Sequence, residues 1–524
     1  MMPLRPGRSI AVNLATGTAT RYVLLAVNIG IGIWMMPFSV GHLGKSDYGL
    51  WMLVVSMTAY FQLFDLGYGN GLVRQITDAD ARGDERAINE LVSTFAVVYA
   101  AIGAVALLAT AALAAWVVPR FPNLSAGQVT TAQWVTVVLG IRIAVGFPMT
   151  VFGAVTTSRQ YFALSSSIAI AVSLLAALVT YLVLEAGYGL RVLVPATTAV
   201  NLLAYVAYAR AAWFAYPGLR LAPSLFSPRH LREVTSYSLY LFLITVAAHL
   251  GYNLDNVVVG AFMGTSAVAV YAVASRLADY QRQLSNQFNG LLFPVVVGLG
   301  AQNDRARLRA TMLHGTRLAL GLALAVTIGL LAFAPPLVRA WMGPTFEDSL
   351  APLYALAIAS VVLVAMGPLG NILLGTGRHR LVAFSSLAEA LLNVGLSLLL
   401  VRRWGLAGVA AGTAIPVVAM NLLVLLPAAC RSLDVRPGRF VREAAAPALL
   451  PAVPALAIAV VLRLYVPPAS LLAVAAAGAL VGLVYLAGFV SFGLPAGDRR
   501  QYVSYIRRAA GSTRQPVAAV ESGG

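Results

Sequence analysis

The chain is dominated by uncharged apolar runs of about 20 residues, which recur from end to end and match the bilayer core when helical. The runs are continuous and rich in Leu, Ala and Val, whereas the strands of a membrane barrel alternate in polarity. With 60% hydrophobic and 10% charged residues, the sequence predicts an all-α, polytopic membrane protein. We expect about fourteen transmembrane helices, near residues 20–41, 47–71, 91–117, 131–156, 162–184, 191–214, 236–262, 267–298, 313–340, 352–375, 381–401, 405–430, 443–466 and 469–493.

An internal repeat relates the two halves of the chain. The layout of residues 44–84 returns without a gap at residues 264–304: a glycine turn, an aromatic residue, a long apolar run, then a charged loop that holds Asp84 or Asp304. Each half has six expected helices, an even number, so both copies enter the membrane from the same side and the repeat is parallel. The expected parts are a six-helix bundle (1–216), a linker (217–235), a second six-helix bundle (236–432), two additional helices (433–494) and a basic, then flexible, tail (495–524).

The net charge of +17 is interpreted as topology, because Lys and Arg gather in the cytoplasmic loops of membrane proteins. With the N-terminus in the cytoplasm, 26 of the 36 basic residues lie inside and 7 outside. We therefore expect a multi-pass protein of the cytoplasmic (inner) membrane with both termini and the linker in the cytoplasm. Cys430 is the single cysteine and the five His are scattered, so neither a disulfide nor a metal or cofactor site is expected.

Polar side chains follow the eighth expected helix on two adjoining stripes. Such a helix cannot face lipid, because ionisable groups inside the bilayer cost several kcal/mol. It either lines a water-filled cavity, which we favour, or forms a polar seam closed by internal hydrogen bonds. The residues that we expect to contact a substrate in this cavity are Arg142 on the fourth helix and Arg276, Asp279, Arg282, Gln283, Asn286 and Gln287 on the eighth.

Asp255 and Arg276 lie on either side of the turn at Gly264, nine residues before it and twelve after it. Because a helix rises by about 1.5 Å per residue, both have a similar depth in the membrane, and we expect them to form an ion pair across the hairpin. Such a pair either neutralises two buried charges or makes Asp255 a proton-responsive switch. The sequence does not decide between the two.

The other candidates for coupling or gating are single ionisable residues in or near the spans. A lone membrane-depth His more often forms satisfied hydrogen bonds than a proton relay, and a charge near a helix end can anchor that end as well as gate it. Glu389 belongs to a polar stripe with a four-residue period on the eleventh helix, which either lines the cavity or joins helices. These candidates are Asp65, Arg74, His249 and Glu389.

Two segments carry a resemblance to a known family, LFDLGYGNGLVRQ at 63–75 and LDNVVVGAFMGTSAVAVYAVASRL at 254–277. The chain resembles the polysaccharide transporter family, the flippase branch of the multidrug, oligosaccharidyl-lipid and polysaccharide exporter superfamily. The resemblance implies a V-shaped transporter that moves lipid-linked oligosaccharides from the inner to the outer leaflet. One departure is that the first helix has no acidic residue, where many drug-exporting relatives carry a cation-coupling Asp. The matching positions are Asp65, Gly67, Asp255, Gly264, Ala269 and Tyr271.

The residues favour a transporter over an enzyme. Arg142, Arg276 and Arg282 suit an anionic ligand such as a lipid pyrophosphate that bears a glycan. No G-x-x-x-x-G-K-[ST] motif occurs, so an ion gradient or removal of product is the expected driving force. The rival class, a membrane-embedded glycan polymerase or ligase, needs a larger outer loop than 117–131 or 340–352. The expected partners are a lipid-linked anionic glycan, the bilayer and polysaccharide polymerase machinery, with no nucleic acid; a peptidoglycan-precursor flippase and an ion-coupled drug exporter stay open.

Overall fold

The protein is built from helices. The computed structural model describes residues 10–465, 468 and 470–495, and every regular element in these ranges is helical, which confirms the all-α class. The α-helices are α1 (Ile10–Ala59), α2 (Tyr68–Ala81), α3 (Glu85–Ala112), α4 (Ala126–Ser158), α5 (Phe162–Glu185), α6 (Leu190–Ala215), α7 (Pro228–Met263), α8 (Thr265–Ala301), α9 (Arg305–Ala332), α10 (Ala334–Met342), α11 (Leu350–Gly375), α12 (His379–Ala419), α13 (Leu426–Ser432), α14 (Pro437–Phe440), α15 (Ala446–Leu449), α16 (Ala452–Tyr465) and α17 (Leu471–Gly488). Short 3-10 or π-helical segments are η1 (Tyr60–Asp65), η2 (Leu113–Val117), η3 (Val118–Arg120), η4 (Pro223–Leu225), η5 (Pro344–Ser349), η6 (Met420–Leu425), η7 (Val441–Ala445) and η8 (Phe489–Gly493).

Ten helical stretches in the described ranges are long and apolar enough to cross a membrane. Two of them, Ala19–Ala81 and His379–Ser432, each cover two expected spans. In each stretch the helix continues past a kink, at Gly44 in α1 and at Gly405 in α12, and the kink lies where the two expected spans meet. Helices α7 and α8 coincide with expected spans but are not among the ten. A multi-pass membrane protein is confirmed, whereas the count of fourteen stays a prediction.

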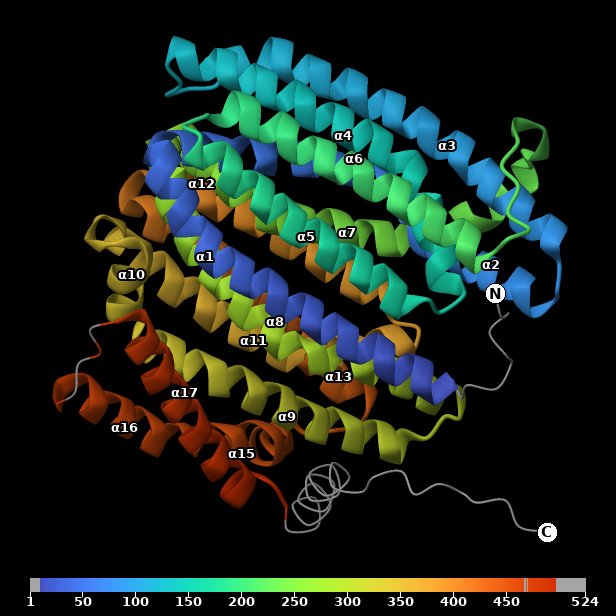
Figure 1. Ribbon diagram of the computed structural model, residues 1–524. Helices are drawn as coiled ribbons and strands as arrows, with labels where there is room; N and C mark the ends of the chain where they lie inside the picture. Colours follow the sequence, from blue (N-terminus) through green and yellow to red (C-terminus); the bar gives the residue numbers. More distant parts are fainter. Residues whose placement is uncertain (1–9, 466–467, 469, 496–524) are drawn as a thin grey trace, which may run out of the picture. The chain divides into compact units, whose positions relative to one another are not determined.

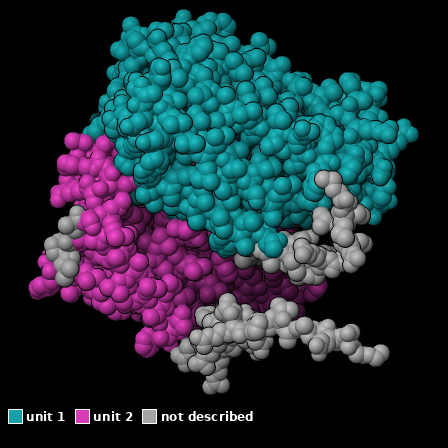
Figure 2. Space-filling view, viewed as in Figure 1, with its two compact units in different colours: residues 1–280, 348–356, 379–420 teal, residues 281–347, 357–378, 421–524 magenta. Residues whose placement is uncertain are grey.

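Contacts group the chain into two compact units, which are coloured separately in Figure 2. Unit 1 contains Met1–Tyr280, Asp348–Leu356 and His379–Met420, and unit 2 contains Gln281–Glu347, Ala357–Arg378 and Asn421–Gly524. This division by contacts differs from the division by sequence repeat, since α8 contributes to both units. The two six-helix halves with boundaries at 216 and 432 therefore stay a prediction.

Within unit 1, five of the first six helices pack in the order α3, α4, α6, α5 and α1, as Figure 1 shows, and α7 packs along α12. Large apolar side chains of α2, α3 and α4 fill the space between these helices. Leu72, Phe95, Tyr99 and Val151 are all fully buried in one cluster. Burying such side chains against one another fixes how α2 and α3 lie on α4.

Within unit 2, the two additional helices pack against α9. Helix α17 lies along α9 (Figure 1), and the backbones meet at two glycines. A Cβ atom added to Gly329 would lie 2.7 Å from the Gly478 carbonyl oxygen, so only glycine permits this approach. Small residues of this kind are typical of helix contacts in membranes.

The backbone repeats its turns in both halves. Gly44 (φ 77, ψ 165) and Gly264 (φ 84, ψ 174), which correspond in the two copies of the repeat, share a conformation that other residues rarely adopt. Asp84 and Asp304 cap α3 and α9 in the same way, each accepting a hydrogen bond from the backbone N–H three residues on, at 2.9 and 3.0 Å. These matching geometries support the duplication.

Candidate functional site

The most enclosed acidic side chain of the predicted site is Asp255 on α7, which is 5% exposed. The Tyr271 hydroxyl on α8 donates to its Oδ2 at 2.5 Å. The Thr413 hydroxyl on α12 lies 2.8 Å from the same oxygen and 3.0 Å from Oδ1. Hydroxyl donors from two other helices therefore satisfy this carboxylate, which a bilayer-depth carboxylate requires.

The kink at Gly405 brings the two arms of α12 together beside this carboxylate. Asn393 on the first arm donates to the Thr413 hydroxyl on the second at 3.2 Å. Ser397 lies 3.2 Å from the Asn393 amide oxygen and 3.3 Å from the Val409 carbonyl. Both Asn393 and Ser397 are buried, so this part of the predicted polar stripe joins helices.

The ion pair predicted between Asp255 and Arg276 is wrong. Tyr271 lies seven residues beyond the turn at Gly264 and reaches back to Asp255, whereas Arg276 is five residues further along α8. Those five residues exceed one helical turn, so Arg276 lies deeper and on another face. Its side chain is exposed, and its guanidinium lies over the Tyr280 ring at 6.0 Å from the centroid.

Helix α8 presents its polar side chains on two different faces. Gln281, Ser285 and Asn289, spaced by four, are buried. Asn289 donates to the Asn286 side chain at 2.8 Å and to the Val364 carbonyl at 2.9 Å, so this residue joins α8 to α11, whereas the Gln281 amide has no hydrogen-bond partner among the described residues. The predicted contact residues have the opposite character: Arg276, Gln283, Asn286 and Gln287 are exposed, and Asp279 and Arg282 are partly exposed.

Asp65 lies at a break between α1 and α2. The residue ends η1, and Leu66 (φ 52) and Gly67 (φ 76) follow in left-handed conformations before α2 begins. The Tyr99 hydroxyl on α3 donates to Asp65 Oδ1 at 2.5 Å. The expected span 47–71 is therefore interrupted, and its acidic residue is half-buried at the interruption.

The remaining candidates lie apart from the hydrogen bonds that hold Asp255. Arg74 is exposed on α2, and Arg142 is half-buried on α4, where its carbonyl accepts from the Tyr205 hydroxyl at 3.4 Å. His249 is half-buried on α7 and contacts the Asn253 side chain at 3.4 Å. Glu389 is half-buried on α12.

Three hydroxyl and amide side chains join the repeated turns at Gly44 and Gly264. The Ser46 and Thr265 hydroxyl oxygens lie 3.2 Å apart, and Gln128 Nε2 on α4 lies 2.8 and 3.1 Å from them. A Cβ atom on Gly49 would lie 1.8 Å from the Thr265 carbonyl oxygen, so the two backbones also meet here. We call Ser46, Gln128 and Thr265 the clasp.

The linker is fixed to α3 by buried side chains that the sequence prediction missed. Asn89 donates to the Gly218 carbonyl at 3.1 Å and accepts from the Arg220 N–H at 2.8 Å. Ser93 accepts from the Ala222 N–H, and Thr94 accepts from the Ser227 N–H at the start of α7. The only sequence signal is that Asn89 and Ser93, four residues apart, share one helical face.

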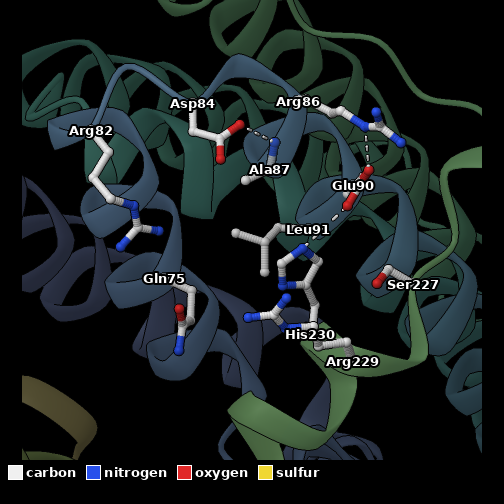
Figure 3. Close-up of a pocket in the computed structure, with 10 residues that line it drawn as sticks. All are labelled: Gln75, Arg82, Asp84, Arg86, Ala87, Glu90, Leu91, Ser227, Arg229 and His230. Carbon is white, nitrogen blue, oxygen red and sulfur yellow. Dashed lines mark hydrogen bonds and ion pairs between the residues drawn. The ribbon is translucent and has the colours of Figure 1, made fainter.

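Beside the linker lies a cavity of about 570 Å³, drawn in Figure 3, between the end of α2, the start of α3 and the start of α7. Its two acidic side chains are both engaged. Asp84 caps α3, and Glu90 binds Arg86 at 2.8 Å and His230 at 3.4 Å. The lining thus has three arginines against two carboxylates, and the contact between Glu90 and His230 joins α3 to α7.

The described part of the chain holds no group of three His, Cys, Asp or Glu side chains that could bind a metal ion. The groups in direct contact with the Asp255 carboxylate are the Tyr271 and Thr413 hydroxyls, which are oxygen atoms. Oxygen sets of this kind take a hard cation, and the carboxylate alone takes a proton. The role of Asp255 in coupling stays a prediction.

Comparison with known proteins identifies the family. A family model described as polysaccharide biosynthesis protein matches residues 42–351, which is more than half of the chain. The chain belongs to this family. The match covers the clasp, Asp255, Tyr271 and the whole of α8, whereas Thr413 on α12 lies beyond its end.

Two curated relatives of this family member are similar in sequence. The uncharacterized membrane protein EpsK of Bacillus subtilis (strain 168) is 24% identical over 415 residues, 76% of this chain and 79% of that protein. The probable low-salt glycan biosynthesis flippase Agl15 of Haloferax volcanii is 21% identical over 198 residues. That match spans 37% of this chain and 42% of the flippase.

Solved structures show the fold of this family member. The lipid II flippase MurJ, in an inward closed conformation, aligns with a TM-score of 0.70 at 13% identity, covering 91% of this chain and 98% of MurJ. An inward-facing multidrug resistance MATE family transporter of the MOP superfamily aligns with a TM-score of 0.64 at 16% identity, covering 78% and 95%. The chain therefore has the helical fold of these membrane transporters.

Proposed function

We propose that the protein moves a lipid-linked oligosaccharide, carried on a polyprenyl pyrophosphate, from the inner to the outer leaflet of the cytoplasmic membrane for surface polysaccharide synthesis. Its family supports the substrate class, and its transporter fold supports movement without covalent chemistry. The name of one relative, a probable glycan biosynthesis flippase, supports the same function. The lipid tail stays in the bilayer while the polar head group crosses.

The observation that carries this proposal is the accessible polar face of α8. Arg276, Gln283 and Asn286 are exposed on a helix of 37 residues, long enough to cross a bilayer. Guanidinium groups bind phosphate oxygens through paired, charge-assisted hydrogen bonds, and amides both donate to and accept from sugar hydroxyls. This face suits an anionic glycan better than an apolar cationic drug.

Alternating access through the clasp is the mechanism that we propose. The clasp joins the turns at Gly44 and Gly264, which the basic-residue distribution assigns to the outer side. A head group released to that side must pass these turns, so the clasp opens and re-forms in each cycle. Asp255, held by Tyr271 and Thr413, is the proposed coupling residue, binding a proton or a cation while the clasp is closed.

A deletion strain complemented with variants tests the function. Arg276→Ala and Arg282→Ala are each expected to lower export of surface polysaccharide about tenfold at unchanged protein abundance, because one charge-assisted hydrogen bond to the substrate is lost. Arg276→Lys rescues only part, because the bidentate geometry is lost. Arg463→Ala, at an exposed arginine on α16, is the matched control and exports normally.

Other outcomes of this experiment reject the substrate. Normal export by both Ala variants with loss of dye efflux indicates an ion-coupled drug exporter. Cell lysis with intact surface polysaccharide indicates a peptidoglycan-precursor flippase. Reporter fusions test the orientation: enzyme activity outside the cell from a fusion in the linker contradicts cytoplasmic termini.

A further inference from the structure

In the first half, the turn after α2 meets the turn between α4 and α5 through an internal ion pair. Arg159 Nη2 lies 2.7 Å from Asp80 Oδ1. The same guanidinium lies over the Tyr216 ring, 4.8 Å from its centroid. A carboxylate of the chain and an aromatic ring thus occupy the binding positions around this arginine.

The second half has the same two turns but lacks the carboxylate. In the gapless alignment of the two copies, Gly300 corresponds to Asp80, just as Asp304 corresponds to Asp84 and repeats its cap. The α11–α12 turn carries Arg378, which the sequence echo SRQ at 158–160 and GRH at 377–379 pairs with Arg159. Among the residues that the structure describes, Arg378 has no ion-pair partner.

A cavity of about 470 Å³ opens where these turns meet in unit 2. Gly300, Ala301 and Asn303 line it from the α8–α9 turn, and Gly375, Thr376 and Arg378 line it from the α11–α12 turn. Arg305, on the first turn of α9, is a second cationic lining residue. The lining residues include no Asp or Glu.

The two nearby acidic groups already bind other groups of the chain. Asp304 caps α9 through the Arg307 N–H at 3.0 Å. Asp434 lies 3.3 Å from Arg305 and 3.7 Å from Arg309, so one carboxylate serves two guanidinium groups. Asp434 has no oxygen atom within ion-pair distance of Arg378. The site is short of negative charge.

We propose that this cavity binds a phosphate group, which takes the place that the Asp80 carboxylate has in the first half. Arg378 provides a bidentate fork, and Arg305 and the Asn303 amide supply further donors at the cavity wall. A phosphate has more acceptor oxygens than a carboxylate and fits within the cavity volume. The phosphate belongs either to an anionic lipid head group or to a soluble phosphorylated compound. This site is separate from the substrate face of α8.

The test uses the purified full chain in nanodiscs and thermal unfolding as the readout of binding. Inorganic phosphate is titrated at constant ionic strength against chloride in zwitterionic nanodiscs, and phosphatidylglycerol nanodiscs form the second arm. The unchanged protein is expected to unfold at a higher temperature with one of the two. A response to free phosphate identifies a soluble ligand, and a response to phosphatidylglycerol alone identifies a head group. Stabilisation by neither overturns the proposal.

Two glycine variants separate charge from shape. Gly300→Asp restores the carboxylate of the first half. It is expected to weaken binding, as read from the thermal shift, at least about tenfold, because one strong charge-assisted contact is lost. Gly300→Ala is the control, because a Cβ atom there lies 3.0 Å from the Gly375 carbonyl oxygen in both variants. Equal losses in the two variants would show a steric effect and reject the anion site.

Two arginine variants locate the response. Arg378→Gln is expected to lose it as Gly300→Asp does. Arg159→Gln is expected to keep it, because Asp80 already neutralises Arg159. A response that depends on Arg159 and not on Arg378 contradicts the proposal.

Discussion

Two Tyr–Asp hydrogen bonds of the same length lie in different surroundings. Tyr99 donates to Asp65 at 2.5 Å, and Tyr271 donates to Asp255 at 2.5 Å. Asp255 is buried and has a second donor, Thr413, whereas Asp65 is half-buried beside a break in the helix. The same chemical pair therefore closes off one carboxylate and leaves the other within reach of water.

The helices that carry these pairs differ in the same way. The second expected span is interrupted at Leu66 and Gly67, while its repeat, α8, continues as a helix through the corresponding positions, Asn286 and Gln287. A broken membrane helix exposes backbone N–H and C=O groups, which is tolerated only where protein or water satisfies them. At these positions the first half thus has backbone N–H and C=O groups outside a regular helix, whereas the second half has the polar side chains of Asn286 and Gln287.

The largest expected effect is that of Tyr271→Phe. It should lower the free energy of unfolding by about 2–3 kcal/mol, because a buried carboxylate loses a charge-assisted donor. Denaturant titration of the purified protein in detergent measures this loss. In an Asp255→Asn background the same substitution should cost less than half as much. An equal cost in both backgrounds would show that the loss of stability does not depend on the Asp255 carboxylate.

Gly67→Ala should have the next largest effect. Gly67 has φ 76, and an L-residue in this region costs about 1–2 kcal/mol, so the variant should be less stable by that amount. Gly290→Ala is the matched substitution in the continuous helix, where no atom lies within 4 Å of the added Cβ. It should stabilise by about 0.5–1 kcal/mol. Changes of the same sign in the free energy of unfolding of the two variants would contradict the difference between the two helices.

Tyr99→Phe should have the smallest effect on stability, about 0.5–1 kcal/mol, because water can replace the lost donor at the half-exposed Asp65. The same denaturant titration compares it with Tyr271→Phe. If Tyr99→Phe cost as much as Tyr271→Phe, the two carboxylates would be equally enclosed and the contrast would fail.

The sequence predicted what depends on local pattern. Apolar run length predicted the helices, and the recurrence of Gly44 as Gly264 predicted a turn that the backbone repeats. The polar stripe of α8 predicts a substrate cavity, which stays a prediction, and Arg276, Gln283 and Asn286 are exposed on this helix. The D-x-G pattern at Asp65 and Gly67 contained the signal for the break, but an apolar run of membrane length around it favoured an unbroken helix.

Partners across helices could not be predicted in the same way. Depth from the turn at Gly264 does not fix which face of α8 meets α7, since each residue rotates by about 100°. The sequence therefore predicts Arg276 as the partner of Asp255, where the structure has Tyr271. Thr413 lies 158 residues from Asp255 in the chain, and only the kink at Gly405 brings it there. The hydrogen bonds of the linker to Asn89 and Ser93 likewise depend on tertiary packing.

Cross-linking of the clasp tests alternating access most directly. In a Cys430→Ser background, Ser46→Cys and Thr265→Cys place two thiols where hydroxyl oxygens lie 3.2 Å apart, close enough for a disulfide. The account predicts that oxidation stops polysaccharide export and that reduction restores it, while either single cysteine variant exports under both conditions. Normal export by the fully cross-linked protein would contradict the opening of the clasp.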